Sequence, residues 1–402
     1  MRTTLSLCIL LALPLAAWAQ TPLTEAEAVR QGLARSDLSD LDQAEVRVAQ
    51  ADVLAAGQIP NPTLSYSRDR VGGSPATVEQ SWMLSQAFDL SGKRKLHREA
   101  AERRVELAGA GNAVRRNEFA AAIRRAFHDV LLRQESIRVS EAWVQRFTKV
   151  EGLVGKHARA GEASGYDQRR LARERQSALA RLAAERAELG RAQANLAALI
   201  GTSQEPAGEL LPPVLPAIEI ALDRLDQRPD LRALSLAALA ADLDGRAAKQ
   251  GRIPDLTAGI GPKWVESGGG ISRDSGFALT LSMPLPVFDR QQAGRQRAAA
   301  EAARARAEYR LARARAEAEL RGLHRQAEAL RSAAAEYRAQ AESASPELLR
   351  IAEAAWQGGE SSLLELLDAY RGALESETTA LELAKRARDA RIEIDLLSGS
   401  AE

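Results

Sequence analysis

The feature that most constrains this chain is a short amphipathic strand pattern that runs, through a proline break, directly into a very long helical pattern. In segment 276–290 (GFALTLSMPLPVFDR), apolar residues alternate with small or polar ones from Phe277 to Leu285, the period of a strand with one apolar face. Pro284 and Pro286 stop strand pairing, and Asp289 stands at the position expected for a helix N-cap. Few soluble folds join these elements so directly, and this chain does so twice.

The two occurrences belong to an internal duplication with a period of about 200 residues, far beyond the periods of solenoid proteins. Segment 59–62 (IPNP) corresponds to 253–256 (IPDL), 87–89 (AFD) to 287–289 (VFD), 161–164 (GEAS) to 359–362 (GESS), and 199–201 (LIG) to 397–399 (LSG). We therefore expect a first repeat over 20–201, a proline-rich linker over 202–217 and a second repeat over 218–402.

Each repeat is predicted to contain a β-hairpin between helices. The period-two segments predict strands over about 63–70, 78–87, 256–264 and 276–285. Helices are predicted before the hairpins, over about 24–56 and 218–249. Long helices are predicted over about 93–157 and 291–357, the second interrupted only at Pro346, and shorter ones over about 164–200 and 361–398. The two shorter helices of a repeat, stacked end to end, would match the long one.

The first nineteen residues have the pattern of a secretory signal peptide. Arg2 precedes an apolar segment over 5–15, and Ala17 and Ala19 form a small-x-small cleavage site before Gln20. The only cysteine, Cys8, lies inside this segment, and the cleavage position is not a cysteine. We therefore expect an exported mature chain without a disulfide or a lipid anchor.

No later stretch reaches the roughly 18 apolar residues that a membrane helix needs, so any membrane crossing would be made by strands. Four strands are too few to close a barrel, for which about eight are needed. An isolated amphipathic hairpin pair would expose its edges and its apolar face. Oligomerisation resolves both problems. The net charge of +1 gives no reason to expect nucleic acid as a partner.

The sequence contains no recognisable catalytic or metal-binding motif. There is no nucleophile–base arrangement, no phosphate loop and no cluster of metal ligands, and the four histidines are scattered. We therefore expect no catalytic, cofactor or metal site. The rival interpretation is an exported structural coiled-coil protein whose hairpins pack on its helices, but the alternation in all four strands favours a lipid-facing apolar band.

Over essentially its whole mature length, the chain resembles the TolC-like outer membrane efflux family. The resemblance is carried by the duplicated layout, by segment 284–290 (PLPVFDR) and by segment 358–371 (GGESSLLELLDAYR). It implies a homotrimer with four strands per chain in one 12-stranded outer membrane barrel, surrounded by outer membrane lipid and continued by a periplasmic α-helical barrel. It also implies two partners, a periplasmic adaptor protein and an inner membrane RND-type pump.

The resemblance also assigns roles to residues at the two periplasmic tips. Gly161 and Gly359 would lie in the tip turns, and the acidic gate of the channel would be formed by Glu365, Asp368 and, in the first repeat, Asp167. Ser361 departs from the family pattern, because a basic residue that locks the closed tip stands there in the best-known member. The alternative for the acidic residues is an ordinary solvated helix face.

Two further expectations concern the sheet and the substrate. The strand alternation predicts lipid-facing side chains at Phe277, Leu279, Leu281 and Trp264. Segment 88–94 (FDLSGKR) and Pro346 are similar to the heavy-metal (cobalt–zinc–cadmium) resistance subgroup of the family. This similarity favours divalent metal cations as the substrate. Efflux of drugs or other organic compounds, or a type I secretion duct of the same fold, is the alternative.

Overall fold

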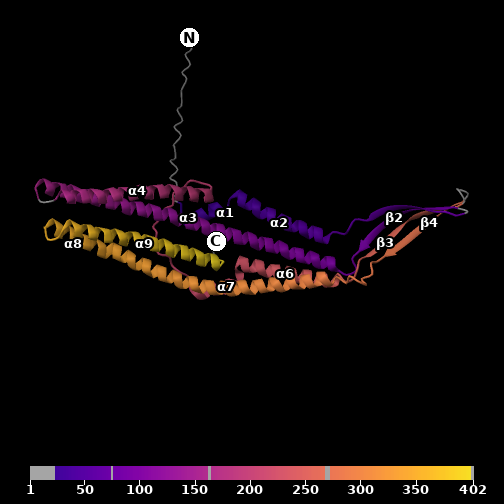
Figure 1. The fold of residues 1–402 in the computed structure, drawn as a ribbon. Helices are drawn as coiled ribbons and strands as arrows, with labels where there is room; N and C mark the ends of the chain where they lie inside the picture. Colours follow the sequence, from indigo (N-terminus) through magenta and orange to yellow (C-terminus); the bar gives the residue numbers. More distant parts are fainter. Residues whose placement is uncertain (1–22, 74–75, 162–163, 268–271, 400–402) are drawn as a thin grey trace, which may run out of the picture.

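The computed structural model describes residues 23–73, 76–161, 164–267 and 272–399, so the predicted signal peptide lies outside the described residues. The molecule is long and thin, with a β-sheet at one end and paired helices along the rest (Figure 1). The predicted fold class is confirmed: the chain is mainly helical and contributes four antiparallel strands. In the described part, no helix is both long enough and apolar enough to cross a membrane.

The four strands form one sheet in the order β1-β2-β3-β4. They are β1 (Thr63–Val71), β2 (Thr77–Phe88), β3 (Leu256–Ser267) and β4 (Ser272–Ser282). The prediction of 276–285 for the last strand was wrong at both ends. The β3–β4 ladder extends to the pair Ser267 and Ser272, so β4 begins four residues before its predicted start. It stops at Ser282 because Pro284 cannot donate a ladder hydrogen bond.

The first repeat contains the helices α1 (Glu25–Leu33), α2 (Ser36–Gly57), α3 (Lys93–Arg159) and α4 (Gly165–Ile200). The single helix predicted over 24–56 is therefore two helices. Arg35 separates them in an extended conformation, with φ −62° and ψ 136°. Its guanidinium donates hydrogen bonds to the carbonyl oxygens of Ala198 and Leu199, at the end of α4, and pairs with Asp37. A contact between residues far apart in the sequence thus breaks a helix that the local sequence pattern favours.

The second repeat is more divided than predicted. It contains α5 (Ile218–Asp223), the 3-10 turn η1 (Leu225–Gln227), α6 (Pro229–Gln250), α7 (Gln292–Ala339), the π-helical turn η2 (Gln340–Ala344), α8 (Ser345–Gln357) and α9 (Leu363–Leu397). The helix predicted over 218–249 is interrupted because Pro229 fits only the first turn of a helix. Pro346 likewise cannot donate within the predicted 291–357 helix, and the π-helical turn that precedes it accommodates the missing bond.

The start of α7 also differs from the prediction. Its N-cap is Gln291, in the left-handed conformation with φ 59°, and not Asp289. Asp289 instead accepts a hydrogen bond from the backbone N–H of Gln291, at 2.7 Å, through its side-chain Oδ1. The aspartate therefore orders the turn that leads into the helix.

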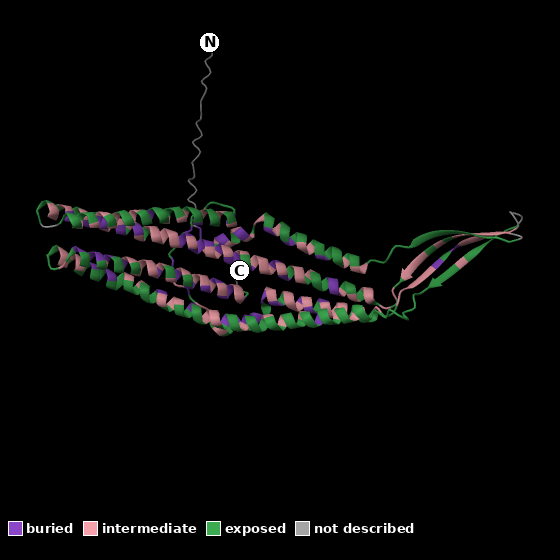
Figure 2. Cartoon of the chain, viewed as in Figure 1, coloured by how far each residue is buried: buried purple, intermediate pink, exposed green. Residues whose placement is uncertain are grey.

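The helices pair along the length of the molecule. In each repeat the two shorter helices lie along the long one: α2 and α4 along α3, and α6 and α9 along α7 (Figure 1). Buried residues form a narrow line between the helices and not one compact core (Figure 2). Two of the buried clusters are centred on Phe127 and Val130 of α3 and on Leu320 of α7, and a third lies near the helical tips. Many core positions are alanines, which let long helices approach closely.

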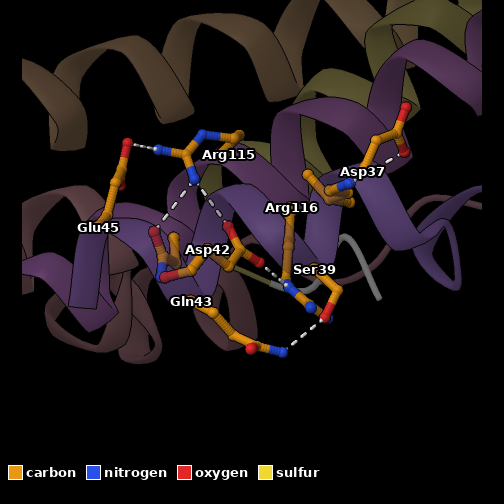
Figure 3. A network of polar contacts seen from close by, with 9 residues as sticks. Asp37, Ser39, Asp42, Gln43, Glu45, Arg115 and Arg116 are labelled. Carbon is orange, nitrogen blue, oxygen red and sulfur yellow. Dashed lines mark hydrogen bonds and ion pairs between the residues drawn. The ribbon is translucent and has the colours of Figure 1, made fainter. Parts of the chain in front are cut away.

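A buried aspartate fixes α2 on α3 (Figure 3). Asp42 is 7% exposed, and its two carboxylate oxygens accept hydrogen bonds from Arg115 and Arg116, each at 2.7 Å. The side chain of Asn112 donates to the backbone carbonyl of Asp42, and Arg115 also pairs with Glu45. Because every charge in this cluster has a partner, it holds the helix pair in one register.

Candidate functional site: the two-faced sheet and the helical tips

The sheet has one apolar face. Residues that pair directly across antiparallel strands point to the same side, so the register identifies the faces. Leu64, Leu84, Ile260 and Leu279 are paired in one continuous row across all four strands. Each of the four is exposed by half or more of its surface. This face therefore presents a band of aliphatic side chains that nothing in the single chain covers.

The opposite face is polar. Ser85, Gly259 and Thr280 form the row next to the leucines, and Ser67 and Ser81 pair nearby with a hydroxyl contact of 2.9 Å. Further along the same face, Lys263 on β3 forms an ion pair of 2.6 Å with Glu79 on β2. A sheet with one aliphatic and one hydroxyl-rich or charged face suits a wall between hydrocarbon and water.

The four residues predicted to face lipid all lie on the apolar face. Phe277, Leu279 and Leu281 are 84%, 71% and 66% exposed, the highest values in β4 among large apolar side chains. Trp264 pairs with Ser275 and with Gln80, which places it on the same side, and it is half-buried.

The polar face is closely packed where β2 and β3 meet. A Cβ atom on Gly261 would lie 1.8 Å from the carbonyl oxygen of Trp82, so no other residue fits there without moving the backbone. On Gly259, a Cβ atom would lie 2.7 Å from Oγ1 of Thr280 and 2.8 Å from Oγ of Ser85. The glycines of β3 are thus needed for the close approach of neighbouring strands.

At the other end of the molecule, two turns reverse the chain between paired helices. The predicted tip glycines lie in these turns, Gly161 between α3 and α4 with φ 83° and Gly359 between α8 and α9 with φ 74°. Both values belong to the left-handed region, which glycine adopts at little cost.

Two of the three predicted gate carboxylates cap the helices that leave these turns. In α4, Oδ2 of Asp167 accepts from the backbone N–H and hydroxyl of Ser164, whose Oγ accepts from the N–H of Asp167 at 3.1 Å. In α9, Glu365 and Ser362 form the same reciprocal pair. These are capping boxes, which the sequence analysis missed although the S-x-x-D and S-x-x-E signals are present at both tips.

Asp368 is the predicted gate residue without such a role. It is exposed one turn beyond Glu365, and within the described residues it has no ion-pair or hydrogen-bond partner. Ser361, where the family pattern has a basic residue, is half-buried, and its Oγ has no partner among the described atoms. Its backbone N–H donates to the carbonyl of Ala355 at 3.3 Å, which helps to end α8.

A compact aromatic cluster supports the tips from the inside. Trp143 and Phe147 of α3 pack against Tyr370 of α9, with ring centroids 5.3 and 5.8 Å from that of the tyrosine. Nε1 of Trp143 donates to Glu377 at 2.9 Å, and the Tyr370 hydroxyl donates to Glu353 at 2.6 Å. Burial, together with this carboxylate, raises the pKa of Tyr370 far above its ordinary value. The cluster joins helices of both repeats near the gate residues.

A second polar cluster joins the repeats at mid-length. Glu25 of α1 accepts hydrogen bonds from Arg124 and His128 of α3, and Arg124 also pairs with Asp395 of α9 at 3.0 Å. Burial alone would raise the pKa of Glu25, but the bonds from His128 and Arg124 outweigh it and lower the pKa to about 2. This carboxylate is therefore ionised over the whole physiological range.

The histidines lie apart, in different surroundings. Nε2 of His128 lies 3.0 Å from Glu25, Nδ1 of His97 lies 3.1 Å from Asp244, and Nε2 of His324 lies 3.0 Å from the carbonyl oxygen of Pro216. His157 packs edge-on against Trp356. Among the residues that the structure describes, no three His, Cys, Asp or Glu side chains are grouped so as to hold a metal ion.

The duplicated helical pairs and the two-faced sheet define a class of protein, the outer membrane channel subunits with a helical extension. The family model for outer membrane efflux proteins matches residues 222–400. The cobalt-zinc-cadmium resistance protein CzcC of Cupriavidus metallidurans is 27% identical over 370 residues, covering 90% of this chain and 85% of the relative.

Solved structures agree on the fold. CusC superposes with a TM-score of 0.76 at 18% identity, covering 93% of this chain and 91% of its own. The outer membrane protein VceC of Vibrio cholerae superposes with the same score and identity, covering 93% and 96%. The family match lies within the second repeat, whereas the relative and the two solved structures each cover at least 90% of this chain. The chain thus shares its fold with solved outer membrane channel proteins, as the sequence predicts.

Proposed function

We propose that three copies of this chain form the outer membrane duct of a tripartite efflux system that exports divalent heavy-metal cations. The observation that carries the assembly is the open sheet. β1 and β4 are its outer strands, and each has an edge with no partner in the described chain. Unpaired strand edges are unfavourable in a membrane, and an uncovered aliphatic face is unfavourable in water. Pairing β1 of one copy with β4 of the next removes the edges, and closing the ring of twelve strands leaves the aliphatic face toward lipid.

In this arrangement the strand faces acquire their roles. Phe277, Leu279, Leu281 and Trp264 would contact outer membrane lipid, and the row of Ser85, Gly259 and Thr280 would line the water-filled lumen. The helices would continue the duct through the periplasm to the tips. There they would meet a periplasmic adaptor, which connects the duct to an inner membrane RND-type pump.

The cargo is inferred from the relatives. One is a cobalt-zinc-cadmium resistance protein, and the nickel-cobalt-cadmium resistance protein NccC of Alcaligenes xylosoxydans xylosoxydans is 26% identical over 294 residues. Exposed carboxylates at the tips suit cations as cargo, since Asp368 offers a charge that no other group in the described chain neutralises.

Deletion of the gene, followed by growth on zinc, cobalt and cadmium, tests the cargo. We expect the deletion strain to become sensitive to at least one of these metals, and the wild-type gene to restore growth. Hydrophobic dyes and organic toxicants provide the control, with no change expected. Sensitivity to the dyes alone would instead support efflux of organic compounds, and normal metal tolerance would refute the proposed cargo.

The tip carboxylates would act as a cation-selective gate. Three copies of Glu365 and Asp368 around one axis bring six carboxylates close together, and Asp167 adds three from the first repeat. Such a ring attracts cations and repels anions.

The capping role of Glu365 decides how the gate should be tested. Replacement by alanine would remove both the charge and the capping box, and loss of such a cap costs about 1 kcal/mol. The double variant Glu365→Gln and Asp368→Asn removes the charges but leaves an oxygen that can still accept from Ser362. In planar bilayers we expect this variant to form channels with reduced cation selectivity. A matched control, Glu360→Gln, removes a nearby charge outside the proposed ring. Unchanged selectivity of the double variant would mean that the carboxylates are a solvated face.

A further inference from the structure

All four connections between strands and helices lie at the same end of the sheet. α2 leads into β1, β2 into α3, α6 into β3, and β4 into α7 (Figure 1). This end, defined by segments 57–62, 88–98, 249–255 and 283–297, is called the junction below. It is the boundary between the apolar sheet face and the helices.

The junction carries a strong positive charge. Segments 89–98, 249–255 and 289–297 contain nine basic residues and three aspartates, a balance of +6. At the opposite end of the sheet, segments 69–73, 76–79, 265–267 and 272–275 contain two arginines and four acidic residues, a balance of −2. The basic residues of the junction are Lys93, Arg94, Lys95, Arg98, Lys249, Arg252, Arg290, Arg295 and Arg297. The two ends of the sheet thus carry net charges of opposite sign.

Internal ion pairs account for only part of this charge. Lys93 pairs with Asp255 at 2.8 Å, and Lys95, Arg98 and Arg297 each have a glutamate four residues further along the helix. Within the described residues, the other five have no carboxylate partner, and they are exposed or half-buried: Arg94, Lys249, Arg252, Arg290 and Arg295.

Helix stability does not explain the charge either. The positive end of the helix dipole favours acidic residues in the first turn. At the tips, α4 and α9 follow this rule with Asp167 and Glu365. The first turns of α3 and α7 contain no acidic residue, but three basic residues in α3 and one in α7. The backbone N–H groups at the start of α3 already have an acceptor. The carboxylate of Asp89 accepts hydrogen bonds from the N–H groups of Ser91, Gly92 and Arg94. The basic residues are therefore kept where they oppose the dipole.

Exposed apolar side chains stand directly beside these charges. Eight large apolar residues of the junction are between 42% and 94% exposed: Ile59, Phe88, Leu90, Ile253, Met283, Leu285, Val287 and Phe288. Along the chain, Phe288 is two residues from Arg290, Leu90 is three from Lys93, and Ile253 adjoins Arg252. A cavity of about 510 Å³ opens among Lys93, Arg94, His97 and Arg104, with Asp52 and Asp255 on its wall. An apolar band next to a basic band matches the boundary between acyl chains and anionic headgroups.

We propose that the junction binds anionic phospholipid headgroups on the side of the membrane where the helices emerge. The basic residues would contact the phosphates while the neighbouring apolar residues enter the acyl region. This inference rests on the proposed membrane insertion of the sheet. It adds a preference for lipid charge, which the aliphatic face alone does not provide.

The test compares lipids that differ only in the headgroup. The full-length protein, purified in neutral detergent, is incubated with equimolar phosphatidylglycerol and phosphatidylcholine of identical acyl chains, and retained lipids are counted by native mass spectrometry. We expect the wild type to retain phosphatidylglycerol preferentially, by about tenfold or more, since each basic residue near an anionic surface contributes about fivefold. The preference should weaken as the salt concentration rises.

The informative variant is Arg94→Gln, Arg252→Gln and Arg290→Gln, which removes one unpaired arginine from each of the three charged segments and leaves no carboxylate without a partner. We expect it to lose most of the preference, and the corresponding triple lysine variant to keep it. The matched control removes Arg173, Arg181 and Arg325, which are exposed and equally unpaired in the described part but lie along the helices. This control should behave as the wild type.

The outcomes separate this inference from the proposed assembly. If the wild type retains both lipids equally, or the glutamine variant keeps the preference, the junction does not recognise headgroup charge and the inference fails alone. The same holds if the control variant loses the preference to an equal extent. If the wild type retains neither lipid, the sheet does not enter lipid, and the inference fails together with the proposed function.

Discussion

At the scale of single residues, Gly261 shows how strictly one position can be specified. Its missing side chain permits the approach of β2, because a Cβ atom would meet the backbone of Trp82. We expect Gly261→Ala to destabilise the sheet by about 1–3 kcal/mol, the usual cost of overpacking, and to lower the amount of protein recovered from outer membranes. Gly276→Ala is the matched control in the neighbouring strand, since no atom lies within 4 Å of its added Cβ. Equal recovery of both variants would contradict the proposed crowding.

Glu25 gives a prediction about pH. Its pKa is lowered from 4.5 to about 2 in the folded protein, so its ionised form stabilises the fold above pH 4.5, and this contribution is lost as the pH falls toward 2. At 1.36 kcal/mol per unit of pKa difference, the contribution is about 3 kcal/mol at neutral pH. Glu25→Gln should therefore unfold at lower urea concentration at pH 7, as followed by far-UV circular dichroism in detergent.

The difference between wild type and Glu25→Gln should shrink toward zero as the pH approaches 2. Asp40→Asn serves as the control, because Asp40 is exposed and has no partner among the described residues. Its stability should follow that of the wild type at every pH. A Glu25→Gln variant with unchanged stability at pH 7 would show that the Arg124–His128 cluster does not depend on this charge.

At the scale of elements, strand β4 offers a direct comparison of its two faces. Leu279 lies on the aliphatic face and Thr280 on the hydroxyl-rich face, one residue apart. An arginine on a lipid-facing strand position costs about 2–4 kcal/mol near the bilayer midplane, whereas one facing water costs little. We expect Leu279→Arg to reduce insertion into outer membranes strongly and Thr280→Arg to insert nearly as well as the wild type. Equal insertion of the two variants would refute the assignment of the faces.

At the scale of the whole molecule, the open sheet predicts the assembly. A single copy leaves both outer strands, β1 and β4, with free edges and a whole face of aliphatic side chains exposed. We expect the detergent-solubilised particle to have three times the mass of the mature chain, measured by light scattering with correction for bound detergent. A monomer that stays in solution without detergent would contradict the assembly, the proposed duct and the lipid contacts together.

The sequence by itself determined the features that depend on local periodicity. Alternation of apolar residues located all four strands, and the recurrence of turn glycines such as Gly161 and Gly359 revealed the duplication, because both signals are carried by neighbouring residues. The division of the sheet into one apolar and one polar face followed from the same alternation. Only the S-x-x-D and S-x-x-E capping signals at the tips were present in the sequence and were overlooked.

Other features were decided only by the tertiary structure, because they depend on residues far apart in the chain. The break between α1 and α2 is made by Arg35, whose guanidinium reaches the end of α4 more than 160 positions away. The role of Gly261 depends on the neighbouring strand, and the lowered pKa of Glu25 depends on two side chains of α3. Local pattern thus specified the elements, whereas contacts between distant segments decided where helices break, where strands approach most closely and which charges are buried.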